Sequence, residues 1–332
     1  MELSNKIFFI IPLQIIAILA YFPIARKLKL FDFPNKRSSH KTITFRGGGV
    51  LIPISLIFYI IFFGFNHGLS KFYLILGVLL SSIISFYDDW KGSNPFIRLI
   101  CHFISVGLIM MDITNDFKFS PFIIIIIAII GVAAVNAFNF MDGINAITGL
   151  YVLVFFETIL FYHYKIEHIF DPNFIAVIII ALLIFGFYNF RTKAILFAGD
   201  VGSVSLGIIC VFYVLFLILH NHDIIYLAML AVYGVESGLT IFYRLIKGQN
   251  IFQAHRMHLF QDLVHATKLP HLTVSFLYTI VQVIINFGMF ICIKQGYQGY
   301  IYLSYVLILL IGTYIILKYQ IFKRTELLNE EN

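Results

Sequence analysis

Charged side chains are scarce in this chain. Asp, Glu, Lys and Arg make up 12% of its 332 residues, whereas 60% are hydrophobic, and the mean hydropathy is +0.93. This composition excludes a soluble globular domain. The apolar runs are continuous rather than short and alternating, so a membrane-spanning barrel is also excluded. Because lipid cannot satisfy free backbone groups, the runs must then form helices. We therefore predict an all-α protein, a polytopic membrane bundle of helices.

Cysteine is rare, and long polar linkers and internal repeats are lacking. The three cysteines, Cys101, Cys210 and Cys292, all fall inside apolar runs, which excludes a disulfide framework and indicates small buried side chains. No basic stripe interleaved with aromatic residues lies outside these runs, so the pI of about 9.0 does not indicate nucleic acid. Without a linker, one integral membrane domain over residues 1–332 is sufficient.

Eleven apolar runs approach the roughly 20 residues that a helix needs to cross a bilayer. We expect spans at about 7–25, 49–66, 70–87, 96–111, 119–138, 147–163, 173–190, 203–219, 223–243, 272–293 and 299–318. The first run ends in Arg26 and Lys27 with no small-residue cleavage site, so we interpret it as a retained helix rather than a signal peptide.

Lysine and arginine are unevenly divided between the two sides of such a bundle. When the connections are assigned alternately to the two sides, 18 of the 23 Lys and Arg residues fall on one of them. Cytoplasmic loops carry the excess of positive residues. Eleven spans then place the N-terminus outside and the C-terminus in the cytoplasm.

Four acidic clusters at the ends of apolar runs lie on the side predicted to be cytoplasmic. They are the Asp88 and Asp89 pair in FYDDW, Asp142 in NAFNFMDGINA, Asp200 in FAGDVGS, and Asp262 directly after HRMHLFQ. Ionisable groups at a membrane edge are costly, which makes a functional role the first hypothesis. Carboxylates gathered on one face favour a divalent cation and a phosphate substrate.

The first predicted cytoplasmic loop reads FDFPNKRSSHKTITFRGGGV. Its Lys41 and Arg46 are cationic donors suited to a lipid phosphate or a diphosphate. The three glycines that follow allow the backbone to approach an anion closely. The alternative is an ordinary positive-inside loop with a glycine packing face.

The second connection carries adjacent like charges. Asp88 and Asp89 repel each other, and the pKa of one is raised unless a cation lies close. A Mg²⁺ ion or a phosphoryl acceptor chain explains such a pair. The alternative is a helix end whose solvated carboxylates pair with Lys91 and Arg98.

The third and fourth connections supply further oxygen-bearing side chains. Asn136 and Asn139 are three residues apart, and Asp142 continues their face if the helix persists. These oxygens suit a hard divalent cation or hydrogen bonds to a uracil or a sugar amide, with interhelical hydrogen bonding as the alternative. Asp200 lies between two glycines just before a helix, where it is placed to hold Mg²⁺ or to cap that helix.

The fifth loop is the longest and contains HRMH. His255 and His258 are three residues apart and share a helix face, but no third ligand stands at a spacing that zinc requires. Hydrogen bonds from both histidines and from Arg256 to a diphosphate fit this pattern better. The alternative is a pair of loop histidines without a role.

Taken in order, these motifs resemble the polyprenyl-phosphate N-acetylhexosamine-1-phosphate transferases, the membrane enzymes that begin peptidoglycan, teichoic-acid and O-antigen lipid intermediates. The likeness covers about residues 30–265 and consists of PNKRSSH…RGGG, DD, NAFNFMDG, GDVGS and HRMH. The eleven-span form of this family, with its N-terminus outside, agrees with the topology predicted above.

The resemblance implies a transfer that depends on Mg²⁺ or Mn²⁺ at the cytoplasmic face of a bacterial inner membrane. An N-acetylhexosamine-1-phosphate passes from a UDP-sugar to undecaprenyl phosphate, and UMP leaves. Catalysis is assigned to Asp88, Asp89 and Asp200, and metal binding to Asp200 and Asp142. Substrate contacts are assigned to Lys41, Arg46, Asn136, Asn139, Asp142, His255, Arg256 and His258. Direct attack and a covalent aspartyl intermediate are both compatible with these residues, as are a monomer and a homodimer.

Two positions depart from the family pattern. Many members carry a second Asp after the DG, where this chain has Asn145, and a proline often stands where this chain has Phe45. The HRMH form resembles the O-antigen initiators more than the muramyl-pentapeptide enzymes, whose loop is richer in His. It favours N-acetylglucosamine or a 6-deoxy-N-acetylhexosamine as the sugar.

Three other classes of protein compete with this interpretation. An ion-coupled or proton-coupled transporter would place its carboxylates near the membrane midplane rather than at one edge. A structural membrane protein needs no GDVGS-type loop. A lipid phosphatase uses the same phosphate and metal chemistry without a nucleotide site, and it releases inorganic phosphate instead of UMP.

Overall fold

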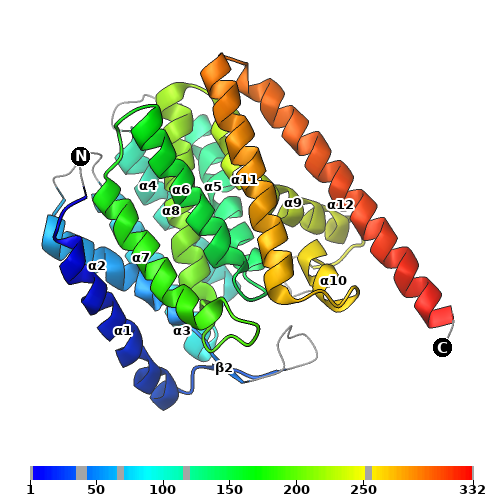
Figure 1. The fold of residues 1–332 in the computed structure, drawn as a ribbon, viewed down its shortest axis with the longest axis horizontal. Helices are drawn as coiled ribbons and strands as arrows, with labels where there is room; N and C mark the ends of the chain where they lie inside the picture. The colour runs from blue at the N-terminus through cyan, green and yellow to red at the C-terminus, as the bar shows by residue number, and fades with distance from the viewer. Residues whose placement is uncertain (1–2, 35–42, 66–70, 115–119, 251–255, 331–332) are drawn as a thin grey trace.

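The computed structural model describes residues 3–34, 43–65, 71–114, 120–250 and 256–330. The chain is almost entirely helical, as predicted, with one two-stranded antiparallel sheet in the described ranges (Figure 1). Its elements in chain order are α1 (Ile7–Leu28), β1 (Phe31–Asp32), β2 (Thr44–Phe45), the 3₁₀ helix η1 (Gly48–Val50), α2 (Leu51–Phe63), α3 (Phe72–Lys91), α4 (Pro95–Thr114), α5 (Pro121–Met141), α6 (Ile147–Lys165), α7 (Pro172–Asn189), α8 (Gly199–Asn221), the 3₁₀ helix η2 (Ile224–Leu230), α9 (Ala231–Ile246), α10 (Leu259–His265), α11 (His271–Gln295) and α12 (Gly299–Glu330).

Ten helical segments in the described part of the chain are long and apolar enough to cross a membrane. They correspond to ten of the eleven predicted spans, with η2 and α9 together forming the ninth. The remaining predicted span, 49–66, is the 13-residue helix α2, which is shorter than expected. Its length is limited by the glycines at both ends, because the RGGG segment forms η1 and Gly64, at φ +70°, ends the helix.

The direction of the outer helices fits an odd number of crossings. In Figure 1 both α1 and α12 run from the upper end of the bundle towards its lower end. The β1–β2 pair and α10 lie at that lower end, as does the end of α3 that carries Asp88 and Asp89. Loops predicted to share one side of the membrane therefore gather at one end of the molecule.

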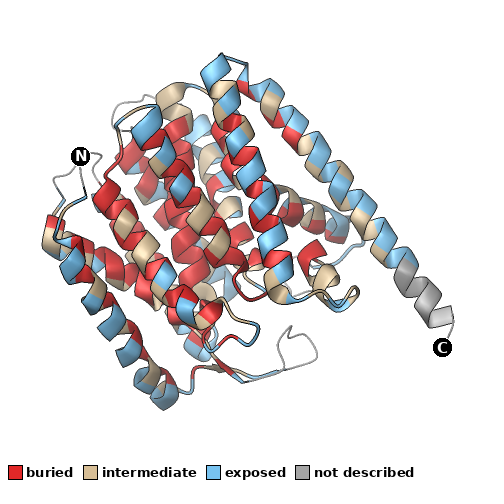
Figure 2. Cartoon of the chain, viewed as in Figure 1, coloured by how far each residue is buried: buried red, intermediate tan, exposed pale blue. Residues whose placement is uncertain are grey.

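Helix α8 forms the centre of the bundle. Of the residues in its most apolar stretch, 94% are buried, against 11% for α12, and Figure 2 shows the exposed faces of α1 and α12 at the periphery. Small residues along α8 allow its neighbours close approach, as is common between membrane helices. Ser205 hydrogen bonds to Ser82 of α3 at 2.8 Å, and Gly207 lies against Phe138 of α5.

The cysteines follow the prediction in two of three cases. Cys101 and Cys210 are buried, whereas Cys292 is partly exposed, and all three are free thiols. Cys292 lies near the far end of α11, where the exposed helix α12 gives only partial cover.

Candidate active site

Two glycine-rich segments interlock at the lower end of the bundle. The amide of Gly48 donates to the carbonyl of Phe197 at 2.8 Å, and the amide of Gly49 donates to the carbonyl of Ala198 at 2.9 Å. A Cβ atom on Gly49 would lie 2.1 Å from the Cα of Gly202, so only glycine fits. The RGGG and FAGDVGS motifs, about 150 residues apart in the sequence, thereby form one packed unit.

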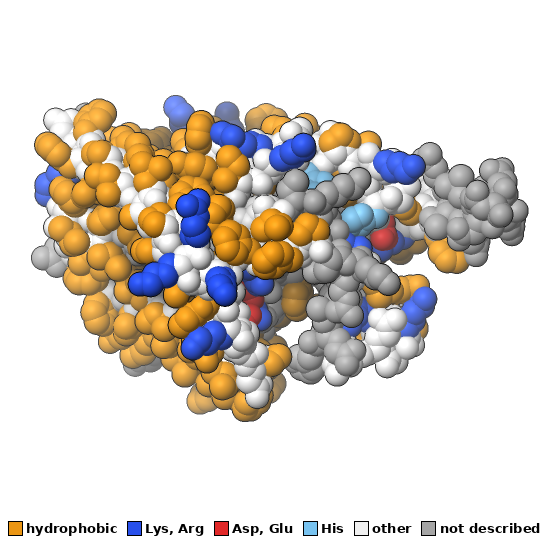
Figure 3. Space-filling view, turned by 90° about the horizontal axis from the view of Figure 1, so that it is seen from below, with side chains coloured by type: hydrophobic (Ala, Val, Ile, Leu, Met, Phe, Trp, Pro, Cys, Tyr) orange, Lys and Arg blue, Asp and Glu red, His pale blue; other side chains and the backbone are white. Residues whose placement is uncertain are grey.

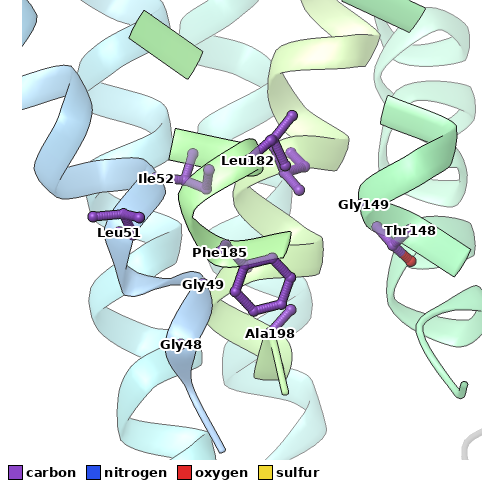
Figure 4. Close-up of a pocket in the computed structure, with 11 residues that line it drawn as sticks. Gly48, Gly49, Leu51, Ile52, Thr148, Gly149, Leu182, Phe185 and Ala198 are labelled. Atoms are coloured by element: carbon purple, nitrogen blue, oxygen red, sulfur yellow. The ribbon is translucent and has the colours of Figure 1, made fainter. Parts of the chain in front are cut away.

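The space behind this contact is nearly filled. Gly48 and Gly49 face Ala198, Phe185, Thr148 and other residues around a buried cavity of about 10 Å³ (Figure 4). That volume is at the lower limit for a single water molecule. The cavity is therefore a packing defect of the glycine contact and not a substrate pocket.

Phe45, the departure from the family pattern before RGGG, has a structural reason. It bridges to Leu196 in parallel, with its amide donating to the carbonyl of Ile195 at 3.2 Å and its carbonyl accepting from the amide of Phe197 at 2.8 Å. A proline has no N–H and would lose the first of these bonds.

Arg46, directly before the three glycines, forms ion pairs with two of the predicted catalytic carboxylates. Its Nε lies 2.6 Å from Asp89 Oδ1 and its Nη2 lies 3.0 Å from Asp200 Oδ1. Burial alone would lower the pKa of Arg46, but Asp89 and Asp200 raise it above its ordinary value, so the guanidinium stays charged. The Arg46 carbonyl also accepts a hydrogen bond from Tyr21 of α1.

Asp89 receives the first amides of α8. Its Oδ1 accepts from the amide of Asp200 at 3.1 Å and its Oδ2 accepts from the amide of Val201 at 3.2 Å. Unpaired amides and the helix dipole make this end of a helix favourable for a carboxylate. The alternative role predicted for Asp200, capping this helix, is wrong: the N-cap is Ala198, and Asp200 lies within the first turn.

Arg98 is the site residue that sequence reasoning missed. It appeared above only as an alternative partner for the acidic pair. In the structure its Nη1 lies 2.8 Å from Asp88 Oδ2 and its Nη2 lies 2.7 Å from Asp200 Oδ2. The available signal was an arginine in the first turn of a largely apolar helix, the kind of intramembrane charge that needs a partner.

The Asn136, Asn139 and Asp142 stripe is only partly as predicted. Asn139 Oδ1 lies 3.5 Å from Arg98 Nη2, and its Nδ2 donates to Ser203 Oγ at 3.2 Å, so it reaches the cluster. Asn136 lies one turn deeper and donates to the carbonyl of Val132 at 2.8 Å. Helix α5 ends at Met141, so Asp142 does not continue the helical face as expected.

Asp142 is set apart from the ion pairs. Burial raises the pKa of Asp142 from 3.8 to about 7, the negative charge of Asp200 adds to the rise, and a hydrogen bond with Thr148 opposes it. The negative charge of Asp200 therefore acts on the Asp142 carboxyl group. The pKa also places its charge change near neutral pH.

The HRMH loop packs on the loop that carries Asp142. The Phe260 ring packs against Gly143, and a Cβ atom added to Gly143 would lie 2.9 Å from Cε2 of that ring. His258 is buried, and its Nδ1 lies 3.5 Å from Oε1 of Glu236 in α9. The shared helix face predicted for the two histidines is wrong for His258, because residues 256–258 are not helical and His258 precedes α10.

Lys41 and His255 lie outside the described residues. Arg256 is partly buried beside His258. Asn145, the other departure from the family pattern, has a structural role, because its Nδ2 donates to the carbonyl of Arg191 at 2.7 Å and its own carbonyl accepts from Ser275 Oγ at 2.7 Å.

The charge balance of the cluster suits a divalent cation. Asp88, Asp89 and Asp200 face two guanidinium groups, which leaves one negative charge in excess. Among the described residues, no three His, Cys, Asp or Glu side chains gather closely enough to enclose a metal ion by themselves. Mg²⁺ is commonly held by one or two carboxylates, with substrate phosphates and waters completing the shell, so the donor chemistry fits.

Seen from below, the end of the bundle that carries these residues is hollowed. Figure 3 shows Lys and Arg side chains on this face, with a few acidic atoms among them, beside a largely apolar flank. This face therefore combines an apolar flank with a charged end.

Comparisons with known proteins show which sequences this chain is similar to. The family model described as "Glycosyl transferase family 4" matches residues 71–220. The phospho-N-acetylmuramoyl-pentapeptide-transferase of Dictyoglomus turgidum is 26% identical over 187 residues, covering 51% of this chain and 59% of the relative. The enzyme of the same name from Dictyoglomus thermophilum is 27% identical over 187 residues with the same coverage.

The matching part of each chain is limited. The chain spans about three fifths of the length of the curated relatives it matches, 59% in both cases. The family match includes α3, α4 and α8, which carry Asp88, Asp89, Arg98 and Asp200, but neither RGGG nor HRMH. In residues 71–220 the chain is similar to glycosyl transferase family 4, and in about half of its length it is similar to two phospho-N-acetylmuramoyl-pentapeptide-transferases.

Proposed function

We propose that this protein transfers an N-acetylhexosamine-1-phosphate from a UDP-sugar to undecaprenyl phosphate. The observation that carries the proposal is the cluster of Asp88, Asp89 and Asp200 with Arg46 and Arg98. It lies at one end of the bundle, where a lipid head group and a soluble nucleotide can meet. A transporter site near the midplane does not fit this position.

The reaction requires one bond to form and one to break. A phosphate oxygen of the lipid attacks the sugar-linked phosphorus, a new diphosphate bond forms, the original diphosphate bond breaks, and UMP leaves with the bridging oxygen. The attacking phosphate is already largely anionic, so positioning and charge stabilisation contribute more than proton transfer.

The residues of the cluster have separate roles in this proposal. Arg46 and Arg98 stabilise charge that develops on the phosphoryl oxygens, since preorganised cations are most effective in a site shielded from water. Asp89, fixed by the α8 amides, holds Arg46 in place. Asp88 positions the lipid phosphate and accepts any proton that the lipid phosphate still carries.

A divalent cation belongs to the same proposal. Asp200 and Asp142 would hold Mg²⁺ or Mn²⁺, which when bound neutralises the diphosphate charge. Asn136 and Asn139 lie on the α5 side of the cluster and are assigned to the nucleotide. His258 and Arg256, on the loop packed against Gly143, are assigned to the diphosphate or the sugar.

The substrate sugar has two candidates. The HRMH sequence favours an O-antigen type N-acetylhexosamine, in lipopolysaccharide or another cell-surface polysaccharide. The names of the Dictyoglomus relatives favour the muramoyl-pentapeptide of peptidoglycan as the second candidate. Both use the same lipid acceptor, at what we propose to be the cytoplasmic face of a bacterial inner membrane.

One assay tests the proposal and chooses the sugar. Purified protein in detergent is incubated with undecaprenyl phosphate, Mg²⁺ and a panel of UDP-N-acetylhexosamines. The panel includes the UDP-linked N-acetylmuramoyl-pentapeptide, and UMP release is measured with and without EDTA. We expect UMP release that requires lipid, metal and one member of the panel. Release of inorganic phosphate from the lipid, with no UMP from any donor, would support a lipid phosphatase instead.

A further inference from the structure

The C-terminal helix α12 reaches the candidate site through one side chain. Lys318 Nζ donates to the carbonyl of Met257 at 2.6 Å and forms an ion pair with Asp262 of α10. Met257 stands between Arg256 and His258 in HRMH. One ammonium group therefore ties the backbone of the motif and the short helix that follows it to α12.

The position of Lys318 is itself fixed on α9. Tyr314, one turn earlier on α12, hydrogen bonds to Thr240 of α9 at 3.0 Å, and the ammonium group of Lys318 lies 5.8 Å from the centre of the Tyr314 ring. The same α9 carries Glu236, whose Oε1 accepts from the amide of Leu259 at 2.6 Å. The loop is thus held from two sides, by a side chain of α9 and by a side chain of α12.

This connection stands out against the rest of α12. The helix is largely exposed, and Figure 1 shows it diverging from the bundle towards its C-terminal end. The side chains of Lys318 and Asp262 are 26% and 30% exposed. A peripheral helix outside the matched family segment 71–220 nevertheless contacts a motif assigned to substrate binding.

We propose that Lys318 is a positioning residue that holds Arg256 and His258 against the Asp142 loop, ready for the diphosphate. The inference rests on the proposed function for the identity of the substrate. Lys318 acts on the backbone of a binding loop and not on the reacting phosphorus, so its loss affects substrate binding more than the chemical step. A helix anchor without this role would leave substrate binding unchanged.

The first test compares Lys318→Met with Lys323→Met, an exposed lysine on the same helix, in the UMP assay. Loss of one ion pair and one hydrogen bond predicts a KM for the UDP-sugar about tenfold higher, with kcat within about twofold of the wild type. Lys318→Arg should restore most of the binding, and Lys323→Met should behave as the wild type. An unchanged KM in Lys318→Met would overturn the proposal.

The second test needs no turnover. Hydrogen exchange of the amides of residues 257–265 should be about tenfold faster in Lys318→Met, with α8 unchanged, because those amides lose a tether that closes the loop. Adding Asp262→Asn to Lys318→Met should change exchange little further, since the two residues share one interaction. Wild-type exchange in Lys318→Met would refute the tether, even if no donor in the panel were turned over and the proposed function itself had failed.

Discussion

Asp200 is the residue on which the charges of the candidate site converge, since each of its oxygens faces a different arginine. Asp200→Asn removes one negative charge with almost no change in volume, so we expect the fold to persist and transfer to be lost. Thermal unfolding and size-exclusion chromatography in detergent establish the fold, and UMP release measures activity. Near-normal turnover by folded Asp200→Asn would remove this residue from the metal site.

Asp88 and Asp89 differ in their surroundings, so their variants should differ as well. Each Asp→Asn change should lower turnover by at least about a hundredfold if the pair acts in phosphoryl transfer. Asp89→Asn should also reduce thermal stability, because an amide cannot accept from both α8 amides as a carboxylate does. Wild-type activity in both variants would leave the pair as helix-end charges.

The pKa of Asp142 gives a prediction about stability and pH. The folded protein holds this proton more tightly than the unfolded chain, whose carboxyl group titrates near 3.8, because burial raises the pKa to about 7. Stability from the neutral carboxyl is therefore fully present below the lower value and is lost as the pH rises through about 7.

The measurement is thermal unfolding in EDTA, from acidic to neutral pH, of the wild type and of Asp142→Asn. The variant lacks the titrating group. Its melting temperature should therefore rise relative to that of the wild type as the pH increases from about 4 to above 7. Parallel curves for the two proteins would show that Asp142 has an ordinary pKa.

At the scale of secondary-structure elements, the glycine contact between η1 and α8 fixes the position of Arg46 relative to Asp200. Gly49→Ala places a Cβ 2.1 Å from the Cα of Gly202, and backbone cannot yield as a side chain can. Overpacking of this kind costs roughly 1–3 kcal/mol, and it would also move Arg46 relative to Asp200. We expect a lower melting temperature and a loss of activity.

Gly107 provides the matched control within the same bundle. It lies in α4, and an added Cβ there meets no atom within 4 Å. Gly107→Ala should leave activity unchanged and stability equal or slightly higher, since alanine favours a helix. Equal behaviour of the two variants would mean that the η1–α8 contact does not control the site.

Periodic and compositional patterns predicted the long elements well. Apolar runs of about 20 residues have few alternatives in lipid, so their existence and type follow from length and composition. The short elements were not predicted. Helix α10 has only seven residues, η2 was merged into an apolar run, and α2 is shorter than its run because backbone turns at glycine, rather than hydropathy, end it.

The candidate site was predictable to the extent that its residues stood in recognisable motifs. Asp88, Asp89, Asp200 and Arg46 do converge, which the order of motifs and the one-sided distribution of carboxylates suggested. Arg98, Glu236 and Lys318 were missed because each depends on which helices pack together. The sequence does not show which residue a charged side chain in an apolar run will pair with, because the pairing depends on how the helices pack.

At the scale of the whole molecule, the proposed reaction between a lipid phosphate and a nucleotide sugar takes place at one end of a helical bundle. The bundle supplies an apolar flank, and its lower end is charged (Figure 3). The orientation that we predict, with the N-terminus outside and the C-terminus in the cytoplasm, would place this end of the bundle beside the nucleotide pool, as the proposed function requires.

The most direct measurement follows the phosphorus itself. UDP-N-acetylhexosamine labelled with ³²P at the sugar-linked phosphate is incubated with undecaprenyl phosphate and Mg²⁺, using wild-type protein and Asp200→Asn. We predict that the label enters the lipid fraction with the wild type, in an amount equal to the UMP released, and not with Asp200→Asn or in EDTA. Label that stays in the soluble nucleotide or sugar fraction for every donor tested, with folded wild-type protein, would contradict the transfer of a sugar-1-phosphate.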